Sequence, residues 1–147
     1  MSWAGRKTIV KYFRSLFHKE QAPSSDIASR KIVPLLTTEY KQLEDKLEVW
    51  VKQKGYRLPD ASVQQSAARI GTTSLKLYRY FAAQGTDFRS WRTTLRIQDA
   101  IEMMRLEPQT SISSIGLRVG IPDRSNFCRQ FKAVMGTTPE TWRKNQK

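Results

Sequence analysis

The sequence predicts an all-α protein in which a long linker helix joins two helix-turn-helix subdomains, preceded by an N-terminal helical extension. Three observations lead to this fold class. Apolar residues recur at helical spacing, and no stretch shows the alternation typical of a strand. Proline and glycine punctuate the chain at short intervals, as expected of short helices with tight turns. In the C-terminal part, one helix-pair pattern occurs twice.

Charge is the most informative part of the composition. The chain has 147 residues, enough for one domain or two very small ones. Its 26 lysines and arginines outnumber its 13 acidic residues, for a formal net charge of +13. Such an excess favours polyanionic partners, with nucleic acid first and an anionic membrane surface second.

The residues that metal sites and nucleophilic catalysis require are scarce. Cys128 is the only cysteine and His18 the only histidine. These counts exclude an intramolecular disulfide, a cysteine zinc site, a multi-histidine metal site and a histidine-based hydrolase triad within this chain. We therefore expect no enzyme activity, no metal and no cofactor. No apolar run is long enough to span a bilayer and no signal peptide is visible, so we expect a cytoplasmic protein.

The N-terminal part, residues 1–31, is predicted to be a basic amphipathic helix followed by a linker. Over residues 1–19, apolar residues recur at i, i+4, i+7 and i+8 from Ile9 onward, with basic residues between them. Residues 20–31 contain proline, serine and alanine without periodicity, as linkers do. This extension is either a docking helix or the cytoplasmic flank of a membrane segment.

A second helix is predicted from about Thr37 to Lys54. Apolar residues spaced 4, 3, 4 and 3 from Leu36 to Trp50 form one stripe along it, which we expect to pack onto the following domain. Gly55 ends this helix.

The duplicated pattern predicts two helix-turn-helix units, at about 61–85 and 111–136, and a final helix follows at about 138–146. The run AARIG, starting at Ala67, recurs about 50 residues later as GLRVG. The run LYRYF, starting at Leu77, likewise recurs as FCRQF. Two copies of a helix-pair pattern in a basic chain are more specific than one.

A linker helix is predicted between the two units, at about 87–106. Ile97, Ile101 and Met104 fall at i, i+4 and i+7 and should face the core. Trp91 should anchor the start of this helix.

Each unit has the sequence pattern of two short helices around a tight turn. A small residue in the first helix, Ala67 or Gly116, permits close approach of the second helix. Gly71 and Gly120 close the first helix and can adopt positive φ. A glycine-containing turn between amphipathic helices is the DNA-reading unit of many regulators.

The second helix of each unit has a cap and a pair of buried anchors. The predicted caps are Thr72 or Thr73 in one unit and Asp123 in the other. Apolar anchors at i and i+4 should face inward, and the opposite faces are polar and basic. The anchors are Leu77, Phe81, Phe127 and Phe131.

The C-terminal part resembles the signature of the AraC/XylS family of transcription regulators. The run IGLRVGIPDRSNFCRQFK, from Ile115, leads into GTTPETWR, from Gly136. Upstream, the run LRI at Leu95 followed by Ala100 resembles the family's linker helix. The resemblance covers about residues 40–146, and the stretch after Trp50 resembles the form common in Bacteroidetes regulators. Three family aromatics differ here, at Ile121, Asn126 and Trp142.

The resemblance implies that residues 32–147 form a DNA-binding domain that regulates transcription. Its two recognition helices, about 34 Å apart, would enter successive major grooves of double-stranded DNA. An activator of this kind would also contact RNA polymerase. Family members usually carry a separate sensor or oligomerisation domain, so this chain is either part of a longer regulator, with a sensor or membrane domain elsewhere, or a minimal one. No small-molecule site is evident.

The base-reading face follows from the anchors and agrees with the family's reading positions. Residues opposite the anchors recur at i, i+1, i+4 and i+5 on both recognition helices. Arginines there could donate two hydrogen bonds to guanine, and apolar or aromatic side chains could contact thymine methyls. The predicted base-reading residues are Ser74, Leu75, Tyr78, Arg79, Arg124, Ser125, Cys128 and Arg129.

Other polar residues are predicted to contact phosphates, which position the protein without reading sequence. Several lie at helix starts, where free amides favour anions. The candidates are Thr73, Lys76, Arg92, Ser111, Ser113 and Lys132. Arg69 and Arg118 are either phosphate contacts or surface charges. Arg96 resembles a structural family arginine, which we expect to pair with an acid such as Asp99 or Glu102.

One alternative function remains open from the sequence. The basic N-terminal helix would suit a membrane-surface or protein-docking module. The operator sequence, the inducing signal, the oligomeric state and the direction of regulation do not follow from these residues.

Overall fold

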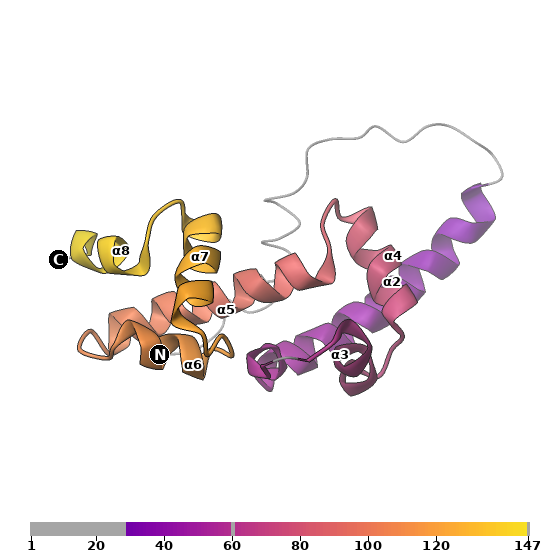
Figure 1. Cartoon of the computed structure of the whole chain (residues 1–147). Helices are drawn as coiled ribbons and strands as arrows, with labels where there is room; N and C mark the ends of the chain where they lie inside the picture. The colour runs from indigo at the N-terminus through magenta and orange to yellow at the C-terminus, as the bar shows by residue number, and fades with distance from the viewer. Residues whose placement is uncertain (1–28, 60, 147) are drawn as a thin grey trace. The chain divides into compact units, whose positions relative to one another are not determined.

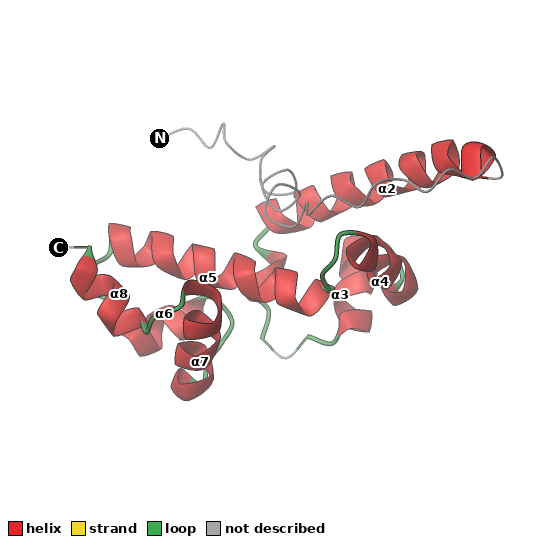
Figure 2. Ribbon diagram, turned by 90° about the horizontal axis from the view of Figure 1, so that it is seen from above, coloured by secondary structure: helices red, strands yellow, loops and turns green. Residues whose placement is uncertain are grey.

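The computed structural model describes residues 29–59 and 61–146, with side chains from residue 38 onward. The predicted helix at 1–19 and the docking alternative built on it lie outside the described residues. Within this part every regular element is helical, which confirms the all-α class (Figure 2). The elements are α2 (Ser29–Lys52), the short 3-10 helix η1 (Gly55–Arg57), α3 (Val63–Ile70), α4 (Ser74–Ala83), α5 (Phe88–Leu106), α6 (Ile112–Arg118), α7 (Arg124–Met135) and α8 (Pro139–Asn145).

The described chain forms two compact units. The first contains α2, α4 and all of α3 except its first residue, Val63. The second contains residues 54–63, including η1, together with everything from Phe88 onward. α5, which covers the predicted linker helix, therefore packs as part of the second unit.

The start of α2 differs from our prediction. The helix begins at Ser29, inside the stretch predicted to be a linker, and not near Thr37. Pro34, which the prediction places before the helix, lies within it. A proline removes one main-chain donor from the helix. Tertiary packing of the later turns supplies most of a helix's stability, so the helix can include such a residue. Local composition alone therefore misplaced this boundary.

The first unit is held by the predicted stripe of α2 and the anchors of α4. Leu47 of α2 and Leu77 of α4 are fully buried, as expected. Tyr80, which the periodicity did not mark, is also buried, and its ring meets Tyr40 of α2 edge-on with centroids 5.4 Å apart. The Tyr80 hydroxyl donates to Glu44 Oε1 at 2.9 Å, so α4 is attached to α2 by both apolar and polar contacts.

The second unit is built around α5, with α6, α7 and α8 packed on it (Figure 1). The three predicted core residues of α5, Ile97, Ile101 and Met104, are all buried. They share one cluster with residues of the other three helices, which include Ile112, Ile115, Phe127, Phe131 and Trp142. The indole of Trp142 also carries the Arg105 guanidinium over its face at 5.5 Å.

Two glycines of the second unit are required where we predicted them. A Cβ on Gly116 would come within 2.9 Å of the Ile121 carbonyl oxygen and 3.0 Å of the Phe127 ring, so only glycine lets α7 approach α6 this closely. Gly120 has φ +90°, and a Cβ there would lie 2.0 Å from the carbonyl oxygen of Arg57. Gly71 closes α3 in the same left-handed region.

Asp99 of α5 holds the segment around η1 in place. Arg57 donates to both carboxylate oxygens, at 2.6 and 2.9 Å, and the Tyr56 hydroxyl donates at 3.0 Å. Burial alone would raise the pKa of Asp99, but the hydrogen bonds from Arg57 and the charges of Lys54 and Arg57 outweigh it and hold this pKa below its ordinary value. Burial and the Asp99 charge raise the pKa of Tyr56 far above its usual range, so its hydroxyl stays a donor.

Arg96 is structural, as expected, and two of its partners are backbone carbonyl oxygens. Its Nε and Nη2 donate to the carbonyl oxygens of Tyr56 and Leu58. The carboxylate of Asp99, one of the two acids expected to pair with Arg96, receives Arg57. Residues 54–58 donate hydrogen bonds to the Asp99 carboxylate and accept hydrogen bonds from the Arg96 guanidinium. Helical periodicity does not predict either set of contacts.

Candidate nucleic-acid interface

α4 has the form of a recognition helix with one buried and one exposed face. Thr73 caps it, because its side chain accepts the backbone N–H of Lys76, which decides between the two predicted caps. On the face opposite Leu77 and Phe81, Leu75 and Tyr78 are 55% and 69% exposed. Large apolar side chains this open to solvent, between basic neighbours, form a ready contact surface. Exposed Arg79 and half-buried Ser74 complete the predicted set.

α7 repeats this arrangement in the second unit. Asp123 caps it by accepting the backbone N–H of Asn126 at 2.6 Å, as predicted. Phe127 and Phe131 are fully buried. Of the predicted reading residues, Arg124, Ser125 and Arg129 are exposed, whereas Cys128 is half-buried and packs against the core. Cys128 therefore packs against the core with one side and lies at the edge of the exposed face of α7.

Arg124 is not a free arginine in this structure. Its Nη2 donates to Glu140 Oε1, in the first turn of α8, at 2.9 Å. The hydrogen bond to Glu140 raises the pKa of Arg124, and the same bond lowers the pKa of Glu140. Burial, followed by the Glu140 charge, raises the pKa of the neighbouring Cys128 thiol. The two arginines of α7 thus differ, because Arg124 has an acidic neighbour that holds its guanidinium.

Five of the six predicted phosphate contacts fall into two groups. Lys76, Ser113 and Lys132 are exposed. The hydroxyls of Thr73 and Ser111 each cap a helix by accepting a backbone N–H, which leaves both residues at the exposed start of α4 and α6. Helix starts of this kind present further free amides to an anion.

Arg92 has intramolecular contacts that the sequence did not indicate. It is half-buried, donates to the Ala61 carbonyl oxygen at 2.8 Å and lies over the Phe88 ring. Burial, followed by the charge of Arg89, lowers its pKa. A contact between Arg92 and phosphate remains a prediction. In this structure its guanidinium contacts the Ala61 carbonyl oxygen and the Phe88 ring of the second unit.

Arg118 and Lys46 also have partners that sequence reasoning missed. Arg118 forms two hydrogen bonds with the carboxylate of Glu107, across the loop that leads into α6. Lys46 of α2 donates to the carbonyl oxygen of Gly71, in the turn before α4, at 2.7 Å. Neither partner lies at helical spacing, so only the tertiary fold brings these pairs together.

Within the residues described, no group of histidine, cysteine and acidic side chains has the arrangement of a metal site. In the same part of the chain, no helix combines the length and apolar character that crossing a membrane requires.

Comparison with known proteins identifies similar sequences. The model of the helix-turn-helix domain family matches residues 66–145. The transcriptional activator NphR of Rhodococcus sp. is 28% identical over 85 residues, which are 58% of this chain and 25% of that protein. The chain thus spans about a quarter of the length of this curated relative.

Solved structures share the fold at low sequence identity. The DNA-binding domain of AdpA, a global transcriptional factor solved in complex with a target DNA, has a TM-score of 0.59 at 17% identity, covering 70% of this chain and 90% of that one. The C-terminal domain of AraT, a response regulator from Geobacillus stearothermophilus, has a TM-score of 0.56 at 23% identity, covering 76% and 85%. A DNA-binding transcriptional dual regulator from Escherichia coli K-12 has a TM-score of 0.58 at 18% identity, covering 67% and 90%.

Proposed function

Because the chain belongs to the AraC-type helix-turn-helix family, we propose that it regulates transcription by binding double-stranded DNA at specific sequences through α4 and α7. The observation that carries this proposal is the repeated form of these two helices. Each has a polar N-cap, a buried pair of anchors at i and i+4, and an exposed face that carries arginine. The net charge of +13 supports a polyanionic partner.

The reading chemistry differs between the two helices. α7 offers Arg124 and Arg129, whose guanidinium groups each match the O6 and N7 acceptors of guanine. α4 offers one such group, Arg79, beside Leu75 and Tyr78, which suit the methyl group of thymine. We infer that the second unit prefers G·C pairs and that the first reads a mixed site, with each helix in a major groove.

The wider regulatory setting is part of the same proposal. The chain acts on cytoplasmic DNA by binding and not by catalysis, and RNA polymerase is a further partner when the bound protein activates transcription. The curated relative NphR is an activator. A sensor or membrane domain outside this chain would supply the signal.

Selection of bound duplexes from a random DNA pool, at near-physiological salt, tests the proposal. We expect an enriched motif with two parts whose centres lie about one helical turn apart, about 10 bp. Parallel selections with Arg129→Ala and with Arg79→Ala should each erase information in a different part of the motif. Strongly salt-dependent binding to every duplex without enrichment would refute specific reading by this chain.

A further inference from the structure

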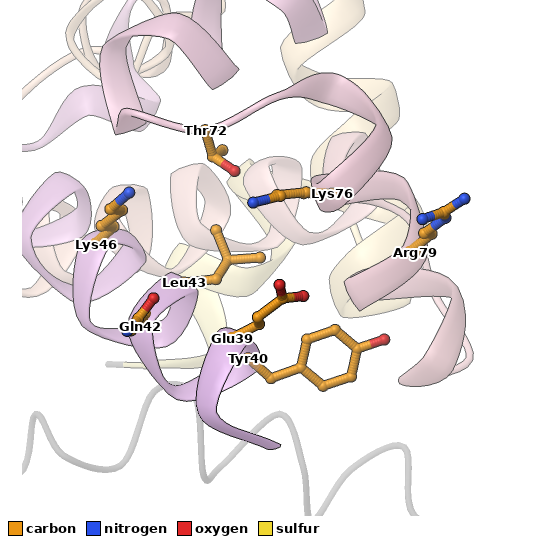
Figure 3. A pocket seen from close by; sticks show the side chains of 8 residues that line it. All are labelled: Glu39, Tyr40, Gln42, Leu43, Lys46, Thr72, Lys76 and Arg79. Carbon is orange, nitrogen blue, oxygen red and sulfur yellow. The ribbon is translucent and has the colours of Figure 1, made fainter. Parts of the chain in front are cut away.

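A small cavity lies in the first unit, between α2 and the start of α4. Its volume is about 160 Å³. A site needs about 10–15 Å³ of such volume to hold one water molecule, so the cavity has room for a tetrahedral anion and some of its water. The charged and hydroxyl side chains that line it are Glu39, Lys46, Thr72, Lys76 and Arg79 (Figure 3).

Positive charge predominates in this cavity, and one of the cations is held in place. Lys46 Nζ donates to the Gly71 carbonyl oxygen at 2.7 Å, which positions the ammonium group at the turn between α3 and α4. An ammonium group has three N–H donors, so two are left for another acceptor. Figure 3 shows the side chains of Lys46 and Lys76 extending toward one another on either side of Thr72.

The cavity flanks the predicted reading face of α4. Lys76 and Arg79 lie at i and i+3, on one side of the helix. Arg79 also belongs to the reading face, next to exposed Leu75. A helix in a major groove has base edges in front of it and sugar-phosphate walls at its flanks. A side of α4 that adjoins the reading face would therefore meet a phosphate.

We propose that this cavity binds one phosphate of the DNA backbone, held by the ammonium groups of Lys46 and Lys76 and by the hydroxyl of Thr72. This inference rests on the proposed function and adds α2 to the DNA interface. Lys46 was not among the phosphate contacts predicted from sequence. The Glu39 carboxylate lines the same cavity and opposes the phosphate, so it weakens this contact.

The salt dependence of DNA affinity tests the inference in the full chain. Each phosphate neutralised adds about 0.9 to the slope of log K against log salt. Lys46→Gln leaves Lys76 at the phosphate and should lower the slope by up to this amount, so its affinity defect should shrink by up to about 3.5-fold between 50 and 200 mM salt. Lys41→Gln is the matched control, because exposed Lys41 lies on the same helix and does not line the cavity. Lys46→Arg, which keeps the charge, should restore the slope.

Neutral methylphosphonate linkages, placed one at a time in the selected duplex, identify the phosphate itself. At one position the linkage should weaken binding by the wild type and cause a smaller loss in Lys46→Gln, in which Lys76 and Thr72 still contact the phosphate. Glu39→Gln should instead tighten binding about two- to fivefold, because it removes an opposing charge. If Lys46→Gln fails to fold in a thermal melt, Lys76→Gln gives the same two readouts.

Two results separate failure of this inference from failure of the proposed function. Equal slopes for Lys46→Gln and Lys41→Gln, with the sequence preference intact, would overturn the phosphate site alone. If the wild-type chain binds all duplexes without sequence preference, the proposed function itself is refuted.

Discussion

Replacing Gly120 by alanine should destabilise the protein far more than the same replacement at Gly136. Both glycines have positive φ, +90° and +75°. An L-residue in this region costs about 1–2 kcal/mol, so both variants carry that penalty. They differ in their surroundings, because a Cβ on Gly136 meets nothing within 4 Å, whereas a Cβ on Gly120 would lie 2.0 Å from the Arg57 carbonyl oxygen and 2.7 Å from its carbon.

The additional cost at Gly120 follows from what must move. The clashing atoms are backbone, and Arg57 is held by its two hydrogen bonds to Asp99. Relieving such overpacking costs about 3 kcal/mol. The total for Gly120→Ala is therefore about 4–5 kcal/mol, against about 1–2 kcal/mol for Gly136→Ala.

Thermal unfolding followed by far-ultraviolet circular dichroism measures this difference. At about 3 °C per kcal/mol for a chain of this size, Gly120→Ala should lower Tm by about 12–15 °C and Gly136→Ala by about 3–6 °C. Equal decreases would show that the segment around Arg57 yields at little cost, and would refute the reasoning from close approach.

Four further predictions concern the interface and the second unit. Arg129→Ala should cost about 1–3 kcal/mol at the selected site and relax one base position, and uniform weakening on all sequences would contradict its base-reading role. Lys132→Ala should weaken all sequences alike and reduce the salt slope by about one; a change in base preference would argue against a phosphate contact. Glu140→Gln should release the Arg124 guanidinium and lower discrimination at the base that Arg124 reads, without reducing non-specific affinity. The interpretation requires this effect to vanish when Arg124 is already alanine. Asp99→Asn should reduce the free energy of unfolding in urea at pH 7 by about 3 kcal/mol, the low end for breaking a buried ion pair, because Lys54 and Arg57 are about a third exposed. Because the folded pKa of Asp99 is lowered, its contribution is complete above the unfolded value of about 3.9 and is lost as pH falls through the folded one. The gap between wild type and variant should therefore begin to shrink below about pH 4 and close as pH falls through the folded pKa, and a constant gap would disprove the linkage.

Sequence periodicity predicted which face of each helix is buried, because that pattern is contained within a single helix. The apolar spacing shows which side of a helix faces the core, so it predicted the burial of Leu77, Phe127 and Phe131. All three are fully buried. Turn chemistry was equally informative, since Thr73 and Asp123 cap their helices as local side-chain geometry requires. The start of α2 was missed because its first turns carry proline and serine, which suggested a linker.

Side-chain partners across elements could not be predicted in this way. Arg57 lies in a single 3-10 turn with no repeating pattern, yet it pairs with Asp99, 42 residues further along the chain. Glu140 reaches Arg124 only because the turn at Gly136 brings α8 back toward the start of α7. For the candidate interface, sequence therefore predicted the exposed faces of α4 and α7, but not that Cys128 and Arg92 are half-buried or that Arg124 is already paired.

The second unit is discontinuous along the chain, and this limits how the protein can be divided. Residues 54–63 precede α3 and α4 but pack with α5 to α8. A fragment that began at Phe88 would contain all of α7 yet would remove the donors that Lys54, Tyr56 and Arg57 present to Asp99. It would also remove the Tyr56 and Leu58 carbonyl acceptors of Arg96. It would also leave Gly120 without the backbone it packs against. Replacing the second unit of one regulator of this design with that of another therefore needs two junctions, one on each side of α3 and α4. Only then are both segments of the unit exchanged together.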